Sequence, residues 1–391
     1  MTTAADKVWD IIIVGGGLGG LSLAVELAAP EFAHLRVLVL EKRSAYTRDR
    51  TWSYWASAPH RYTHLERQRW KQWSVALGNT THTQESAQHS YATIDADAFY
   101  NHAQACIQVA PHVQLQMGCG AAKIDAAART VTTAQGRVLR ARTLLDARPT
   151  TQLAPGTLVQ QFVGWEVTTQ HNAFNASTVQ LMMFEPHDRG LHFWYVLPYS
   201  ARCALVESTW VSPASWQPDD TQELKAYMAK LCGPQPYSVV YQEQGVLNLQ
   251  AAAPAPASAS TVNPVPGLGR NGGTLRGATG YAFLDTVAHA SALAGSLAQW
   301  LQQAPTGHWQ PPAFERPAMD RWMDAVFLDV LRSNWRAAPG YFMQIFDQLP
   351  AQDTVAFLTG RASWAQRWAM MRSLPVKPFA SAAVARQWGH N

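Results

Sequence analysis

The feature that most constrains this chain is a β-branched run followed at once by a cluster of glycines, close to its start. Residues 11–14 read Ile-Ile-Ile-Val, which is typical of a strand buried on both faces. Five of the next six residues are glycine, and the apolar residues at 21–28 then predict a helix. A second buried strand is predicted at 37–40. Residues 9–41 are therefore expected to form a strand-helix-strand unit of an α/β fold.

The glycines have the GxGxxG spacing of dinucleotide-binding sites, at Gly15, Gly17 and Gly20. The first permits a tight turn, the second lets the backbone approach a pyrophosphate, and the third lets the helix pack closely on the strand. Glu41 ends the second strand, where a carboxylate can bind a ribose hydroxyl. GxGxxG alone is a weak signal. Because strand, helix and carboxylate occur in the required order here, we predict a dinucleotide site.

A second glycine-rich stretch, at residues 267–281, favours FAD over NAD as the dinucleotide. The first motif opens the chain, and Asp146 follows another apolar run, so a later segment could complete the site. Backbone amides of that later stretch could bind the remaining phosphate and the edge of the isoalloxazine ring. We therefore expect the cofactor to be FAD.

Between and after these stretches, the hydrophobic pattern predicts a sheet and then helices. Strands are expected at 159–167, 178–184, 192–196, 203–210 and 239–246. A helix is expected at 91–109, and a flexible low-complexity loop at 251–260. The predicted fold is α/β: a Rossmann-type FAD-binding domain (first part, 1–157), a mainly antiparallel substrate domain (158–250), a second flavin-binding segment (251–300) and a helical C-terminal region (301–391).

Composition narrows the possible partners. A net charge of +4, with no run of five basic residues, weighs against nucleic acid. Hydrophobic residues make up 47% and charged ones only 15%, with 16 tryptophans, which fits either a large aromatic core or an apolar tunnel or membrane-facing surface. The scattered cysteines and histidines predict no disulfide framework and no metal site. Without a signal-peptide pattern or a span of about 18 apolar residues, we expect a cytoplasmic protein, at most peripheral to a membrane.

A series of motifs along nearly the whole chain resembles the bacterial lycopene beta-cyclase family, flavoproteins of the geranylgeranyl-reductase-like superfamily. These motifs are the glycine fingerprint with Glu41, RTWSYW at 50–55, DAR at 146–148, QFVGWEV at 161–167, WYVLPYS at 194–200, ALVEST at 204–209, and Gly272-Gly273 followed by TGYAF at 279–283. The chain departs from the family at Met183, where an aspartate is usual.

The resemblance implies an isomerase (intramolecular lyase) of carotenoid biosynthesis. Such a cyclase protonates the terminal double bond of a linear carotene, as in the conversion of lycopene to beta-carotene. The cation then closes a six-membered ring and loses a proton. The resemblance also implies that FAD acts in its reduced form, with NADPH as the reductant and no net electron transfer. A polyene substrate further implies peripheral contact with the inner membrane.

The resemblance also assigns site residues. It places the essential acid at Glu207. The residues expected to bind the cofactor are Gly15, Gly17, Gly20, Glu41, Arg50, Asp146, Gly272, Gly273, Thr279, Gly280 and Tyr281. Aromatic faces can stabilise a carbocation without quenching it, and the residues expected to do so are Trp52, Trp165, Trp194 and Tyr195.

The strand pattern around Glu207 supports its role as the acid. In a strand at 203–210, Val206 and Ser208 face away from Glu207. A carboxylate buried in such a strand is costly as an anion, so its pKa rises, as a general acid near neutral pH requires. The alternative is a solvent-facing residue or an ion pair.

Other activities are open on the same scaffold. The alternative function is an FAD-dependent oxidoreductase acting on an apolar substrate, namely a monooxygenase, a halogenase-like enzyme or a prenyl reductase. A cyclase product keeps the mass of its substrate, whereas oxidation or reduction changes it.

Overall fold

The predicted strand-helix-strand unit forms the centre of a six-stranded sheet. The computed structural model describes residues 8–149, 153, 156–249, 265–303 and 309–387. β1 pairs in parallel with β2 and β11, and β2 pairs in parallel with β8; β10 and β9 extend the sheet in antiparallel fashion. The bounds are β1 (Trp9–Val14), α1 (Leu18–Leu27), β2 (Val37–Leu40), β8 (Val113–Gln116), β9 (Ala121–Asp125), β10 (Thr130–Thr133) and β11 (Val138–Asp146).

A second, seven-stranded sheet carries the five strands predicted for the middle of the chain. Its order is β16-β12-β15-β14-β13-β5-β6, and neighbouring strands are antiparallel except for the parallel pair β13–β5. The bounds are β5 (Gln72–Leu77), β6 (Thr80–Glu85), β12 (Leu158–Thr169), β13 (Thr178–Glu185), β14 (Leu191–Ser200), β15 (Cys203–Pro213) and β16 (Tyr237–Asn248). Because β5 and β6 belong here, residues 1–157 do not form one FAD-binding unit, which corrects the predicted boundary.

A small three-stranded sheet links the two large ones. It contains β3 (Thr51–Ala56), β7 (Ser90–Asp95) and β4 (Gln68–Trp70), in the order β3-β7-β4. The helix expected at 91–109 is therefore correct only in part, since α2 runs from Ala96 to Gln108. The preceding residues pair with β3 instead, in register from Ser90 to Asp95, and this tertiary pairing outweighs the helical pattern.

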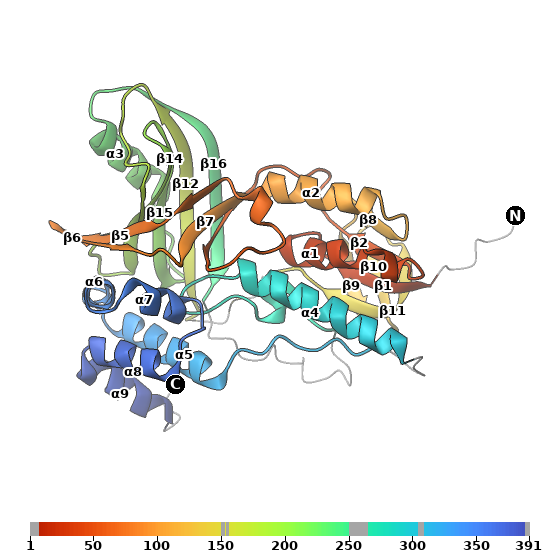
Figure 1. Ribbon diagram of the computed structural model, residues 1–391. Coiled ribbons are helices and arrows are strands. Elements are labelled where there is room, and N and C mark those ends of the chain that lie inside the picture. The colour runs from red at the N-terminus through yellow and green to blue at the C-terminus, as the bar shows by residue number, and fades with distance from the viewer. Residues whose placement is uncertain (1–7, 150–152, 154–155, 250–264, 304–308, 388–391) are drawn as a thin grey trace, which may run out of the picture.

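Helices cover the sheets and build the C-terminal region (Figure 1). α4 (Phe283–Gln302) packs against α1 beside the six-stranded sheet, and α3 (Asp220–Cys232) packs on β12 and β15 of the seven-stranded sheet. The remaining helices confirm the predicted helical end of the chain. They are α5 (Ala318–Ser333), α6 (Ala338–Gln348), α7 (Ala351–Leu358), α8 (Trp364–Ser373) and α9 (Val376–Gln387). The loop predicted at 251–260 lies outside the described residues.

The seven-stranded sheet has two different faces because successive side chains in a strand point to opposite sides. One face packs against α3 through side chains such as Trp194 and Val206. The other carries Leu181, Leu191 and Leu205, which belong to the same apolar cluster as residues of α5 to α8. The second face is the one that borders the site.

Candidate functional site

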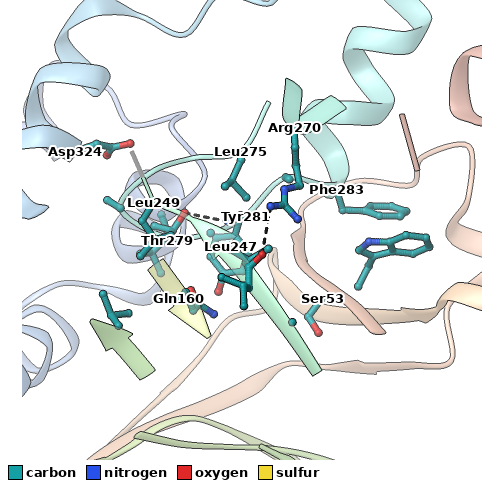
Figure 2. A pocket seen from close by; sticks show the side chains of 18 of the residues that line it. Ser53, Gln160, Leu247, Leu249, Arg270, Leu275, Thr279, Tyr281, Phe283 and Asp324 are labelled. Carbon is teal, nitrogen blue, oxygen red and sulfur yellow. Dashed lines mark hydrogen bonds between the residues drawn. The ribbon is translucent and has the colours of Figure 1, made fainter. Parts of the chain in front are cut away.

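One cavity joins the glycine motif to the space between the seven-stranded sheet and the C-terminal helices. Its volume is ≈ 1460 Å³. Pockets for a single small ligand typically have about 300–1,000 Å³, so this cavity has room for two ligands. Figure 2 shows part of its wall, where Gln160 of β12, Leu247 of β16 and Tyr281 of the second glycine-rich stretch converge.

The first end of the cavity is the glycine motif, whose backbone has the expected geometry. Gly15 has φ +107°, and a Cβ on Gly20 would lie 1.9 Å from the Gly15 carbonyl oxygen, so neither position accepts a side chain. Glu41 directly follows β2 and lies in the cavity wall, where it accepts hydrogen bonds from the Gly16 amide (2.8 Å) and the Arg43 guanidinium (3.0 Å). Burial raises the pKa of Glu41, but these hydrogen bonds outweigh it and hold the pKa below its usual value. Glu41 is therefore an ionised acceptor.

The second glycine-rich stretch completes this end, as the sequence order predicted. Leu268 donates from its backbone to the Asp146 carbonyl (2.9 Å), at the end of β11. Gly269 lies so close to α1 that a Cβ on Gly19 would be 3.0 Å from its Cα. Two glycine-rich backbone segments thus meet at the start of α1, an arrangement that fits a dinucleotide as large as FAD.

The structure divides the other expected cofactor residues into two groups. Arg50, Asp146, Thr279, Gly280 and Tyr281 line the cavity. Gly272 and Gly273 are not part of its lining. They shape the loop instead, since a Cβ on Gly272 would lie 2.7 Å from the Gly267 carbonyl oxygen and Gly273 has φ +83°.

The far end of the cavity is an apolar chamber between sheet and helices. The residues of its walls come from β13 to β15 on one side and from α5 to α7 on the other. They include Leu181, Met182, Leu191, Phe193, Leu205, Val211, Leu328, Leu331, Phe342, Ile345, Phe346 and Phe357. These apolar side chains offer no hydrogen bond to water, and the surface they form suits a hydrocarbon.

Glu207 of β15 lies in the wall of this chamber with only 7% of its surface exposed. Val206 faces the opposite side of the sheet, as the strand pattern predicted. Burial, and then the negative charge of Glu243, raise the pKa of Glu207 well above its usual value. A carboxyl group that is neutral at neutral pH can donate a proton, so this position has the properties of a general acid.

Glu243 was not identified from the sequence, although its strand was. It lies on β16 with 6% of its surface exposed, and its carboxyl group hydrogen-bonds to that of Glu207. Glu243 also accepts hydrogen bonds from the hydroxyls of Tyr241 (2.8 Å) and Thr51 (3.0 Å). The sequence does show a glutamate within the strand predicted at 239–246. Its proximity to Glu207, however, follows only from the strand order β15-β12-β16.

The expected aromatic residues fall on both sides of the sheet. Tyr195 lines the chamber, pairs with Glu207 across β14 and β15, and donates a hydrogen bond to Tyr91 (2.9 Å). Trp52 lines the cavity nearer the dinucleotide end, with its ring edge-on to Phe99 (5.4 Å).

For Trp165 and Trp194 the expectation of a role in the cavity is wrong. Both side chains belong to the apolar cluster under α3, on the opposite face of the sheet, and Trp194 stacks on Tyr227 (4.1 Å). The strand alternation that points Tyr195 into the chamber necessarily turns Trp194 away from it. Met183 packs in the same cluster, so the departure from the family aspartate also lies outside the chamber.

The described residues contain no group of three or more histidine, cysteine, aspartate or glutamate side chains able to hold a metal ion. Nor, within those ranges, is any helix both long and apolar enough to cross a membrane.

The comparisons with known proteins agree along the whole chain. The model of a family described as "Lycopene cyclase protein" matches residues 10–384. Similar curated proteins are a lycopene beta-cyclase of Pantoea ananas (25% identical, covering 98% of this chain and 99% of that protein) and one of Pseudescherichia vulneris (26%, covering 95% and 96%). Among solved structures, a geranylgeranyl bacteriochlorophyll reductase-like protein of Thermoplasma acidophilum has a TM-score of 0.56 at 12% identity (98% and 97% covered). A flavin-dependent brominase has 0.58 at 12% (98% of both). The structural likenesses show a shared fold.

Proposed function

The chain belongs to the lycopene cyclase family, and from this premise we propose that it is an FAD-dependent enzyme that cyclises the linear ends of a carotenoid, as in the conversion of lycopene to beta-carotene. The observation that carries the proposal is the position of Glu207, a buried carboxyl group with a raised pKa in the wall of a deep apolar chamber. The chamber is continuous with the dinucleotide end of the cavity.

The chain's own residues account for the acid-base part of this chemistry. The apolar walls exclude water, which would otherwise quench a carbocation. Glu207 donates its proton to the terminal double bond, the cation closes the ring, and a proton is then lost from a ring carbon. The aromatic faces of Tyr195, Tyr91 and Tyr281 lie close together in this part of the wall and can stabilise positive charge.

The cofactor end has its own residues. Glu41 would accept from a ribose hydroxyl, and the backbone amides of the two glycine segments would face the phosphates. We propose that FAD acts here in its reduced form, with NADPH as the reductant, and supplies an electron-rich ring without net electron transfer.

The product formed in cells that accumulate lycopene tests the proposed function. We expect a pigment of unchanged mass and blue-shifted absorption, analysed by liquid chromatography with mass detection. A product that has gained oxygen, halogen or hydrogen would instead establish the oxidoreductase alternative. Unchanged lycopene beside flavin-loaded protein would contradict lycopene as the substrate.

We also propose peripheral contact with an anionic membrane, through an exposed surface on α8 and α9. Trp364, Trp368, Val376 and Val384 are 66%, 61%, 77% and 53% exposed, far above the usual exposure of such side chains. Trp368 and Val376 also line the cavity, so this surface is continuous with the cavity wall.

The charge of this segment supports the same partner. Residues 361–391 contain five Lys or Arg residues and no Asp or Glu. Arg361, Arg372 and Lys377 are exposed. Tryptophan at a membrane interface, combined with neighbouring basic side chains, is typical of peripheral binding to anionic lipid.

Replacing Trp364 and Val376 together by serine is therefore expected to weaken vesicle binding by at least ~10-fold, because each large apolar side chain contributes about 1.5–3 kcal/mol when it leaves water. The measurement is co-sedimentation with vesicles of anionic phospholipid, with zwitterionic vesicles binding less. Val109→Ser is the control, because Val109 is 83% exposed but directly follows α2, far from α8 and α9 in the sequence. Equal binding of both variants and the unaltered protein would contradict this surface.

A further inference from the structure

Glu207 and Glu243 lie on strands that are not adjacent, and Gly164 of β12 lies between them. Gly164 is the register partner of Glu207 on one side and of Glu243 on the other. A Cβ on Gly164 would lie 2.8 Å from Cγ of Glu207 and 3.3 Å from Cγ of Glu243. The absence of a side chain at this position thus lets the two carboxyl groups meet above the middle strand.

The carboxyl groups of Glu207 and Glu243 cannot both be ionised in this arrangement. Two ionised carboxylates cannot hydrogen-bond to each other, and two like charges in a buried site repel strongly. Both residues are more than nine-tenths buried, and burial raises the pKa of each. At neutral pH the stable state therefore has one neutral and one ionised carboxyl group.

The surroundings decide which of the two holds the proton. Glu243 accepts hydrogen bonds from the Tyr241 and Thr51 hydroxyls, and the positive charge of Arg48 acts on it as well. These interactions stabilise the ionised form of Glu243. The neutral form of Glu207 then donates the hydrogen bond between the two groups.

Other titratable groups near the pair do not change this assignment. Tyr195 is partly buried, and this burial raises its pKa well above the usual value, so it is neutral. The facing helices α5, α6 and α7 contribute one charged residue to the described cavity lining, Asp324, which pairs with Arg276 (2.9 Å).

We propose that Glu243 is a positioning residue that keeps Glu207 protonated at neutral pH, with Gly164 as the gap through which the two carboxyl groups meet. The inference rests on the proposed cyclase function for its use in catalysis. Glu207 gives its proton to the terminal double bond, and the pair becomes two carboxylates facing the cation. When the ring carbon loses its proton, the pair takes one proton back, so the number of protons balances over one turnover.

Infrared spectroscopy tests the pair without any substrate. In the flavin-loaded protein, the carbonyl stretch of a protonated carboxyl group is expected to persist at pH 7 and to be absent in Glu207→Gln. In Glu243→Gln the negative neighbour is gone, so the pKa of Glu207 falls and the band is lost at a pH lower by at least about one unit. The experiment on the unaltered protein requires no variant to fold.

The rate of cyclisation against pH gives the second measurement. Because the protonated acid is the active form, the fall in activity at high pH is expected to move to lower pH in Glu243→Gln by the same amount. Glu223→Gln is the matched control, a half-buried glutamate on α3 across the sheet, and its profile is expected to stay unchanged.

The two proposals fail in different ways. The pairing would be overturned if the infrared band were lost in the pH range where an unperturbed glutamate loses its proton. An unchanged titration in Glu243→Gln would also overturn it. The expected titration in a protein that leaves lycopene unchanged would support the pairing and contradict the cyclase.

Discussion

Replacement of Glu207 by glutamine is expected to lower the rate of ring formation by about 10²- to 10⁴-fold, while the protein retains its flavin. Glutamine keeps the size and polarity of the side chain but has no proton to give to a double bond. Glu207 lies in the chamber wall, away from the glycine motif, so the dinucleotide end is unchanged. The measurements are ring product per flavin, by chromatography, and the flavin absorption spectrum of the purified variant.

The control for this variant is again Glu223→Gln, which changes a glutamate that contacts Trp210 on the α3 side of the sheet (3.1 Å). We expect its activity to match that of the unaltered protein. If Glu207→Gln keeps its activity, Glu207 has no part in the reaction. If it loses both activity and flavin, the variant is misfolded, and a lowered thermal unfolding midpoint would show this directly.

Arg276→Met is expected to give the largest loss of stability, about 3–5 kcal/mol, because it leaves the charge of Asp324 buried without a partner. Both residues are 2% exposed, and the Arg276 guanidinium donates hydrogen bonds to both carboxylate oxygens of Asp324, at 2.9, 3.1 and 3.2 Å. Arg276 also donates to the Phe357 carbonyl. It therefore joins the second glycine-rich stretch to α5 and α7, and urea unfolding monitored by fluorescence measures its contribution.

An exposed ion pair provides the matched control. The side chains of Arg336 and Asp188 are 72% and 64% exposed, so solvent screens the attraction between their charges. Arg336→Met should therefore change stability little. Adding Asp324→Leu to Arg276→Met removes the unpaired charge and is expected to restore part of the loss. Equal effects of the two single variants would show that the buried pair does not hold the loop to the helices.

The local pattern of the chain was sufficient for much of the fold and for part of the site. The strand-glycine-helix order at 9–41 predicted the six-stranded sheet's central unit, because a GxGxxG turn depends on contacts within a few dozen residues. The five strands of the middle region followed from alternation and β-branched residues, and Glu207 followed from a family motif and a strand pattern.

Tertiary structure decided the parts that depend on residues far apart in the chain. Residues 72–77 belong to the seven-stranded sheet because they pair with β13, and residues 80–85 pair with them in turn. Residues 90–95 form a strand because they pair with β3. Trp194 and Tyr195 are neighbours in sequence, yet the strand alternation places them on opposite faces, and only the packing of α3 shows which face is which.

The carboxyl pair shows the same division most clearly. Glu207 and Glu243 are separated by 36 residues, and each is an ordinary glutamate in an alternating strand. They lie close together because β12 pairs with β15 on one edge and with β16 on the other, and Gly164 of β12 lies between the two glutamates in register. The sequence determined which residues could carry a proton. The order of the strands determined that Glu207 and Glu243 share one proton. Burial and the repulsion of like charges act only on groups that the fold brings together.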